Sequence, residues 1–291
     1  MVLSTRASIV DPYIVVLDVE ANAVRALLFD SEARRVEGYS AQLPRRADAA
    51  ADCLDEMHRL VQAAGFRIAA VVGRAEREVT AEDRKFWPAF EGAAWFPSLP
   101  EGAGVMLGGG CVERERFGLA LGEKSMLGTV VESQLEVDGL TCVPIDEKRW
   151  LLSGAAPEAG GAYAALKHEL KMKGSIEGYL ETAAADDPHL AGLSSVERRF
   201  REIFQVLKLA VKEPREVIAC GAALLKSPAW TLRIANALGV PLTLSTEPEP
   251  AARGAALWAL ERIGAIENLE ALSASIGAVV RPVADLSKAG I

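Results

Sequence analysis

The sequence has few of the residues that build metal sites and disulfide frameworks. Four cysteines and three histidines occur among its 291 residues. The cysteines lie far apart, with no C-x-x-C pair, and no histidine stands at the spacing of a metal ligand. We therefore interpret Cys53, Cys111, Cys142 and Cys220 as buried reduced thiols, and the histidines as core or surface residues.

Positive charge and long apolar runs are also scarce. The formal net charge is −8, whereas nucleic-acid binding depends on clustered lysine and arginine. No uninterrupted apolar segment is long enough to cross a bilayer. These absences argue against a nucleic-acid partner and against a membrane partner, and we expect a soluble cytoplasmic protein.

The remaining composition is typical of a folded globular protein with two structural units. Hydrophobic residues make up 50% of the chain and charged residues 25%, and the length exceeds that of a usual single domain. Two apolar runs, Tyr13–Val19 and Ala23–Asp30, and a more polar segment, Arg35–Gln42, predict three antiparallel strands. Apolar spacing predicts a helix over Ala47–Ala64, ended by Gly65 and followed by a strand over Arg67–Val72.

Most of the aromatic bulk falls in one segment without a clear period. Between Arg74 and Pro100 the pattern predicts an irregular connection that contains Phe86, Trp87, Phe90, Trp95 and Phe96. We expect these rings to fill a hydrophobic seam between two lobes, since aromatic area dominates packing energetics. The alternative is that they stack on a sugar.

The second half of the chain alternates strands and helices, which indicates an α/β fold. A Gly-rich segment over Gly102–Gly110 precedes two strands, Phe117–Leu121 and Met126–Glu132, paired around Gly122–Ser125. Further strands are predicted over Glu216–Ala219 and Leu242–Ser245, with a short edge strand after Ile276 and a loose end. Helices are predicted over Gly160–Met172, Ser194–Lys212, Pro228–Leu238 and Ala251–Ile263. A capping box of Ser194 and Glu197 is expected to open the second of these helices.

Three segments, taken in order, resemble the FGGY carbohydrate kinases and fit their gluconate-kinase-like branch best. The first, Val15–Asp30, is similar to that family's first phosphate loop. The second runs from Pro100 (PEGAGVMLGGGC) to Phe117 (FGLALGEKSM), and resembles the stretch with the catalytic carboxylate and second phosphate loop. The third, CGAALLKSPAWTLRIANALGVPL from Cys220 followed by EPEPAARGAALWA from Glu247, resembles the adenosine-side signature and closing helix.

The resemblance implies a fold and a set of ligands. The fold is the actin-like ATPase architecture, in which two ribonuclease-H-like lobes surround a nucleotide cleft, with a shortened N-terminal lobe here. Residues 1–105 would form the first lobe and residues 106–291 the second. The implied cofactors are ATP and Mg²⁺, and the implied substrate is a sugar or sugar acid.

The resemblance also assigns roles to particular residues. Asp18 would hold the metal and take part in catalysis, and Glu101 would be the general base, one methylene longer than the family's aspartate. The remaining cofactor-binding positions are Gly122, Lys124 and Ser125 in the second phosphate loop and Gly221, Ala222 and Ala223 on the adenosine side.

Several positions depart from the family pattern. Glu20 stands where glycine is expected, followed by Ala21 and Asn22 in place of hydroxyl residues. A carboxylate facing a polyanion at about 5 Å would cost roughly 3 kcal/mol at an effective dielectric near 20, unless Glu20 binds an additional cation. The sugar-binding insertion expected between Val72 and Glu101 is reduced to the aromatic connection.

Two functions therefore stay open from the sequence. The first is an ATP-dependent sugar kinase with weak or altered activity, which would use the retained carboxylates and loops. The second is a non-catalytic pseudokinase that keeps the fold for ligand sensing or protein interaction, with a homodimer among the partners considered.

Overall fold

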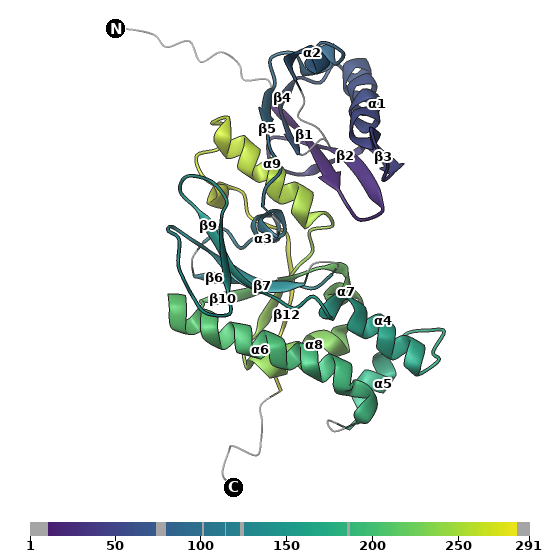
Figure 1. Cartoon of the computed structure of the whole chain (residues 1–291), viewed down its shortest axis with the longest axis vertical. Coiled ribbons are helices and arrows are strands. Elements are labelled where there is room, and N and C mark those ends of the chain that lie inside the picture. Colours follow the sequence, from purple (N-terminus) through teal and green to yellow (C-terminus); the bar gives the residue numbers. More distant parts are fainter. Residues whose placement is uncertain are drawn as a thin grey trace. The chain divides into compact units, whose positions relative to one another are not determined.

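The computed structural model describes residues 11–73, 80–100, 102–113, 115–122, 125–184 and 187–283. The chain divides into two compact units, which are coloured along the sequence in Figure 1. The first comprises residues 1–108 and 251–273, and the second comprises residues 109–250 and 274–291. The domain boundary expected between residues 105 and 106 stays a prediction, because a compact unit need not coincide with a family domain.

The first unit is built on a five-stranded sheet in the order β3-β2-β1-β4-β5. Its strands are β1 (Tyr13–Val19), β2 (Ala23–Phe29), β3 (Arg35–Pro44), β4 (Ile68–Gly73) and β5 (Ala94–Phe96). Strands β3, β2 and β1 are antiparallel, whereas β4 and β5 continue from β1 in parallel. The predicted antiparallel start and the strand after the first helix are confirmed.

Helix α1 (Ala49–Ala64) covers one face of this sheet. Its buried stripe includes Leu54 and Met57, which share a core with Val15 and Leu17 of β1. The helix ends at Gly65 in the left-handed conformation (φ 71°), as predicted. Because side chains alternate along a strand, the next residue of β1, Asp18, lies on the face away from α1.

The aromatic segment is more ordered than the sequence suggested. It contains α2 (Ala81–Arg84), the 3₁₀ helix η1 (Pro88–Phe90) and strand β5, so the prediction of an irregular connection is wrong for these elements. Trp87, Phe90 and Trp95 belong to the core beneath α1, and Trp87 Nε1 donates to Asp55 Oδ1 at 2.5 Å. These three rings belong to the first unit's own core, and Trp95 reaches it because β5 pairs in parallel with β4. The prediction that the rings are buried in a seam is wrong for Phe86, whose side chain is 74% exposed.

The end of the first unit combines elements far apart in the sequence. Helix α3 (Ala103–Gly109) lies against α9 (Pro250–Arg262), and the 3₁₀ helix η3 (Leu269–Ala271) follows. A side chain at Gly254 would place its Cβ 2.0 Å from Gly104 O. The two helices therefore pack with their backbones in direct contact at these glycines. The edge of Phe96 also meets Trp258, with ring centroids 5.3 Å apart.

The second unit contains a seven-stranded sheet in the order β12-β11-β10-β6-β7-β9-β8. The strands are β6 (Arg116–Ala120), β7 (Met126–Val131), β8 (Thr141–Pro144), β9 (Trp150–Ala155), β10 (Glu216–Cys220), β11 (Leu242–Ser245) and β12 (Ile276–Val280). The pairing of β6 with β7 and the edge strand β12 are confirmed. The sequence did not predict β8 and β9, and the loose end expected after β12 extends beyond the described residues.

Helices α6 and α8 lie together on one face of this sheet (Figure 1). The helices of the unit are α4 (Ala159–Glu169), α5 (Glu177–Thr182), α6 (Ala191–Val211), α7 (Ala222–Lys226) and α8 (Pro228–Leu238), with a 3₁₀ helix η2 (Pro188–Leu190) before α6. The capping box at Ser194 is wrong, because α6 continues directly from η2 and Ser194 already lies inside the helix. None of the described helices is long and apolar enough to span a membrane.

Candidate functional site

The turn between β1 and β2 carries the first group of predicted site residues. Asp18 and Arg25 face each other in the register of the two strands. Arg25 Nη2 lies 2.5 Å from Asp18 Oδ2 and 2.7 Å from Glu20 Oε1. The side chains of Asp18 and Arg25 are 19% and 17% exposed, and that of Glu20 is 43% exposed. One guanidinium nitrogen therefore bridges two carboxylates across the hairpin.

The backbone of this turn is closed by its own hydrogen bonds. Glu20 N donates to Ala23 O at 2.9 Å, which leaves Ala21 and Asn22 as the two residues at the tip. Arg45 N donates to Asn22 O at 3.0 Å, and Arg45 Nη1 donates to Glu20 O at 3.3 Å. No residue from Glu20 to Ala23, all of which the structure describes, has a positive φ. The tip therefore does not require glycine for its conformation.

These contacts change the expected electrostatics of the turn. The repulsion of about 3 kcal/mol assigned to Glu20 assumed an unpaired charge, whereas its carboxylate is paired with Arg25. Asp18, the carboxylate assigned to Mg²⁺, has the same guanidinium as its partner. A divalent cation at Asp18 would have to displace, or share the carboxylate with, a charged group that the chain itself supplies. The arrangement of this turn does not fit Mg²⁺.

Arg25 is the residue of this turn that the sequence interpretation missed. A signal for it was present, because a hairpin with a two-residue tip at Ala21–Asn22 pairs residue 20 with 23 and residue 18 with 25. Opposite charges directly across two antiparallel strands form a stabilising pair. The length of the turn is therefore sufficient to predict the partner of Asp18.

The second predicted loop lies after β6. Ser125 is only 3% exposed, and its hydroxyl accepts from Gly122 N at 3.3 Å and donates to Gly122 O at 3.0 Å. Ser125 O accepts from Ala156 N at 2.9 Å. The serine therefore closes the turn and anchors it to the end of β9. Lys124, assigned to phosphate binding, lies outside the described residues, as does Glu101, the predicted general base.

Gly221, at the start of α7, is fixed by close packing within the second unit. It has φ 114°, and a Cβ at this position would lie 2.1 Å from Leu121 O. Leu121 N in turn donates to Cys220 O at 3.0 Å. The structure thus brings Gly221 next to the residue before Gly122, so these two predicted loops meet. Packing between protein segments is sufficient to explain why glycine stands here.

Ala222 and Ala223, the other two adenosine-side positions, belong to helix α7. Helical residues have negative φ, so alanine carries no left-handed strain at either position.

A carboxylate from another helix caps the element that follows. Glu177 of α5 accepts from Ala229 N at 2.9 Å at the N-terminus of α8, and it also accepts from the Ser227 hydroxyl. An anion at a helix N-terminus is stabilised by the helix dipole and by the free amide groups. Trp230, in the first turn of α8, stacks on Tyr163 with centroids 5.6 Å apart. This end of α8 is therefore occupied by protein groups.

Arg253 joins the segments around α9. It is 4% exposed, and it donates to Gly108 O at 3.0 Å and to Ser273 O at 2.9 Å. A third bond reaches Leu272 O at 3.3 Å. These acceptors are backbone carbonyls at the end of α3 and after η3, so the arginine holds the closing helix to both.

The cysteines do not add a reactive group to the site. Cys111 and Cys220 are buried, and burial raises the pKa of each thiol to about 12. Cys53 is buried too, whereas Cys142 is only half-buried, so the prediction of four buried thiols is wrong for Cys142. Among the described residues, no group of three or more His, Cys, Asp or Glu side chains could hold a metal ion.

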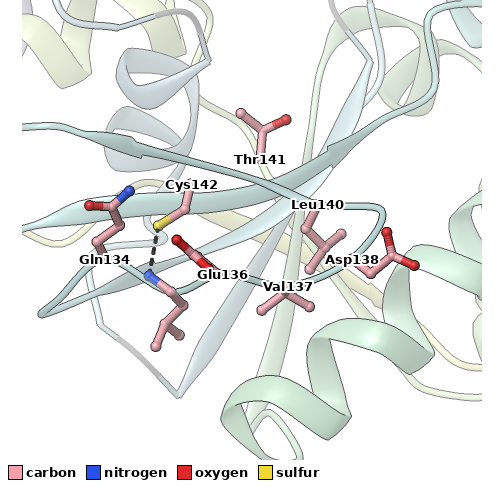
Figure 2. Close-up of a pocket in the computed structure, with 8 residues that line it drawn as sticks. Gln134, Glu136, Val137, Asp138, Leu140, Thr141 and Cys142 are labelled. Carbon is pink, nitrogen blue, oxygen red and sulfur yellow. Dashed lines mark hydrogen bonds between the residues drawn. The ribbon is translucent and has the colours of Figure 1, made fainter.

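A hollow of about 510 Å³ lies in the connection from β7 to β8 (Figure 2). A single stretch lines it, from Gln134 to Thr141 and on to Cys142, whose sulfur accepts from Leu135 N at 3.4 Å. The predicted site residues that the structure describes do not line this hollow. It therefore gives no support to a sugar or nucleotide pocket.

Comparisons with known proteins connect this architecture to solved structures. No family model matches the sequence, and no curated protein matches it. The structure is similar to gluconate kinase from Lactobacillus acidophilus, with a TM-score of 0.74, 14% identity and 94% of each chain covered. Ligand-bound xylulose kinase from the same organism gives a TM-score of 0.73, 14% identity and the same coverage.

Glycerol kinase from Plasmodium falciparum, solved with ADP, gives a TM-score of 0.71 at 9% identity, covering 96% of this chain and 95% of that chain. Identities this low show a shared fold and carry no statement about activity. The two mixed sheets and their helices match the architecture that these kinases share. The chain has the actin-like ATPase fold of the sugar kinases.

Proposed function

We propose that this chain is a non-catalytic relative of the sugar kinases, which uses their fold for ligand sensing or protein interaction. The observation that carries the proposal is the ion pair between Asp18 Oδ2 and Arg25 Nη2 at 2.5 Å. The resemblance assigns Asp18 to the metal, and Mg²⁺ is held in phosphoryl-transfer sites by one or two carboxylates together with substrate phosphates. An arginine is always charged, so it competes with the metal for this carboxylate at any ordinary pH.

The second loop supports the same proposal. The Ser125 hydroxyl both donates to and accepts from Gly122 within the turn. A hydroxyl engaged in this way has no further proton to donate to a phosphate oxygen. Phosphoryl transfer depends chiefly on positioning and on neutralising phosphate charge. Asp18 in the first turn and Ser125 in the second are therefore both bonded to groups of the protein itself.

The alternative is an ATP-dependent sugar kinase that phosphorylates a sugar or sugar acid. In that case Asp18 would hold Mg²⁺ and Glu101 would accept the proton of the attacking hydroxyl. Gly122, Lys124 and Ser125 would contact phosphate, and Gly221 to Ala223 would border the adenosine. The similar structures are a gluconate, a xylulose and a glycerol kinase, so these three compounds are the substrates to test first.

Two measurements on the full chain separate the two functions. The first is the melting temperature with and without millimolar MgATP, because a ligand at 100 times its Kd adds about 2.7 kcal/mol to stability. The second is ADP formation with gluconate, xylulose or glycerol. We expect no sugar-dependent ADP formation. Sugar-dependent ADP formation that Asp18→Asn abolishes would establish the kinase instead. A nucleotide-induced shift without turnover would favour ligand sensing, and the absence of both would favour protein interaction.

A further inference from the structure

The geometry around Arg25 resembles a small coordination site whose cation is part of the chain. Asp18 Oδ2 and Glu20 Oε1 both lie within 2.7 Å of one nitrogen atom, Arg25 Nη2. The two carboxylates converge because residues 18 and 20 point to the same side of the hairpin. Arg25 reaches them from the opposite strand, where it stands directly across from Asp18.

Building on the proposed function, we infer that Arg25 takes the place of a divalent cation and is the residue that excludes metal from this turn. Carboxylate oxygens bind Mg²⁺ at about 2.0–2.1 Å and Ca²⁺ at about 2.3–2.6 Å. The two oxygens lie 2.5 and 2.7 Å from one nitrogen, which is longer than the Mg²⁺ distance and close to the Ca²⁺ distance. The guanidinium is tethered to β2 and cannot dissociate, so it blocks an ion that arrives from solution.

Glu20 acquires a role in this arrangement. The sequence alone left two interpretations of Glu20, a group that repels phosphate or a ligand of an additional cation. Its 2.7 Å contact with Arg25 corresponds to the second interpretation, with the protein supplying the cation. The substitution of glycine by Glu20 and the presence of Arg25 thus act together, since the added carboxylate strengthens the hold on the arginine.

The same unit contains a matched comparison in Arg34. This arginine also pairs with two carboxylates, Asp30 at 3.1 Å through Nε and Glu32 at 2.8 Å through Nη1. The contacts use different nitrogens, the Arg34 side chain is 67% exposed, and Asp30 Oδ1 already accepts from two backbone amides. Removing Arg34 would expose two carboxylates that do not converge on one point.

The test is a Mn²⁺ titration of the full chain without nucleotide, followed by electron paramagnetic resonance of the free ion. The variants are Arg25→Met, its control Arg34→Met, and Arg25→Met combined with Asp18→Asn. We expect Arg25→Met to bind one Mn²⁺ roughly tenfold or more tightly than the unmodified chain, because a unit positive charge leaves the two carboxylates. The control should bind as the unmodified chain does, and the double variant should lose the gain.

Circular dichroism establishes that each variant is folded, and Arg25→Gln provides a second way to remove the charge. A folded Arg25→Met or Arg25→Gln chain without added Mn²⁺ affinity would overturn the inference. So would an equal gain in Arg34→Met. If neither Arg25 variant folds, the test is made on the unmodified chain. Mn²⁺ binding to this chain that Asp18→Asn removes would contradict metal exclusion, whereas no Mn²⁺ binding would support it. Because nucleotide and sugar are not added, this outcome is independent of whether the chain phosphorylates a substrate.

Discussion

The β1–β2 turn and the loop after β6, which the sequence resemblance assigns to two phosphate loops, are held by different forces. In the first, opposite charges join Asp18, Glu20 and Arg25 across a hairpin. In the second, the absence of a side chain at Gly221 allows its backbone to pack closely against Leu121 O. Partly exposed ion pairs are weakened by salt and tolerate rearrangement, whereas close-packed backbone does not. We therefore expect the two regions to respond differently to substitution.

The largest effect is expected from Gly221→Ala. The added Cβ would lie 2.1 Å from Leu121 O in a residue with φ 114°, so overpacking and backbone strain act together. We expect a loss of about 3 kcal/mol or more in the free energy of unfolding, measured by urea titration. The matched control is Gly122→Ala, where no atom lies within 4 Å of the added Cβ. Equal losses in the two variants would contradict the close-packing explanation.

Arg25→Met should have the next largest effect. It leaves Asp18 and Glu20 unpaired on partly buried positions, at a cost of about 2 kcal/mol, between the values for exposed and buried pairs. Added Asp18→Asn should restore part of the stability, because one of the orphaned charges is removed. Urea titrations at low and high salt measure both effects. A loss that does not shrink in about 1 M salt would argue that packing of the arginine stem, and not its charge, holds the turn.

A smaller effect is expected from Ser125→Ala. The substitution removes the hydroxyl that bonds Gly122 in both directions at a buried position, which should cost about 1 kcal/mol. The urea midpoint of the second unit measures it. Ser153→Ala on β9, whose hydroxyl makes no hydrogen bond that the described structure shows, provides a reference for serine removal. If Ser125→Ala costs no more than this reference, the hydroxyl does not hold the turn.

The smallest effects concern two histidines with opposite pH responses. In the first unit His58 Nδ1 accepts from Ala89 N at 3.3 Å, and burial lowers the pKa of His58 below its ordinary value of 6.5. Below pH 6.5 the unfolded chain therefore binds more protons at His58 than the folded chain does. The stabilisation that neutral His58 provides is present above pH 6.5 and is lost as the pH falls through the lowered pKa. The destabilisation caused by His58→Gln should therefore be below about 1 kcal/mol and should shrink from pH 8 to pH 5.5.

In the second unit His189 Nδ1 lies 2.7 Å from Glu169 Oε1, and this hydrogen bond raises the pKa of His189. The stabilisation of the folded chain by protonated His189 is present below pH 6.5 and is lost as the pH rises through the raised pKa. His189→Gln should therefore destabilise the chain more at pH 5.5 than at pH 8. Thermal melting of both variants across this range tests the contrast, and two trends of the same sign would refute it.

Much of the fold could be predicted from local patterns. Strands β1 to β4 and helix α1 with its Gly65 end follow from apolar periodicity and glycine positions, as do α8, β11 and α9 in the second half. Strand β8 was not predicted because it is short, half-exposed and ends at Pro144. Strand β9 was also not predicted, although its six residues are mostly buried. Strand β5 was also too short to predict, because its three residues form a strand only by pairing with β4.

The candidate site was less predictable than the fold. The family resemblance placed Asp18, Ser125 and Gly221 at positions of interest, but it did not reveal what each of them contacts. Asp18 was assigned to a metal and is paired with Arg25, and Ser125 was assigned to phosphate and closes its own turn. A side chain's partner depends on which strands become neighbours, and residue type alone does not specify this.

Strands β1 to β4 and helices α1, α8 and α9 could be inferred from nearby residues, as could the helix-ending glycines Gly65 and Gly239. The negative overall charge follows from composition alone. Long-range packing was needed to place Trp87, Phe90 and Trp95 in the first unit's core. It was also needed to show that Gly221 must lack a side chain and that Asp18 and Glu20 share Arg25. These outcomes depend on contacts that arise when separate segments pack together. The chemistry of the candidate site depends on the same contacts.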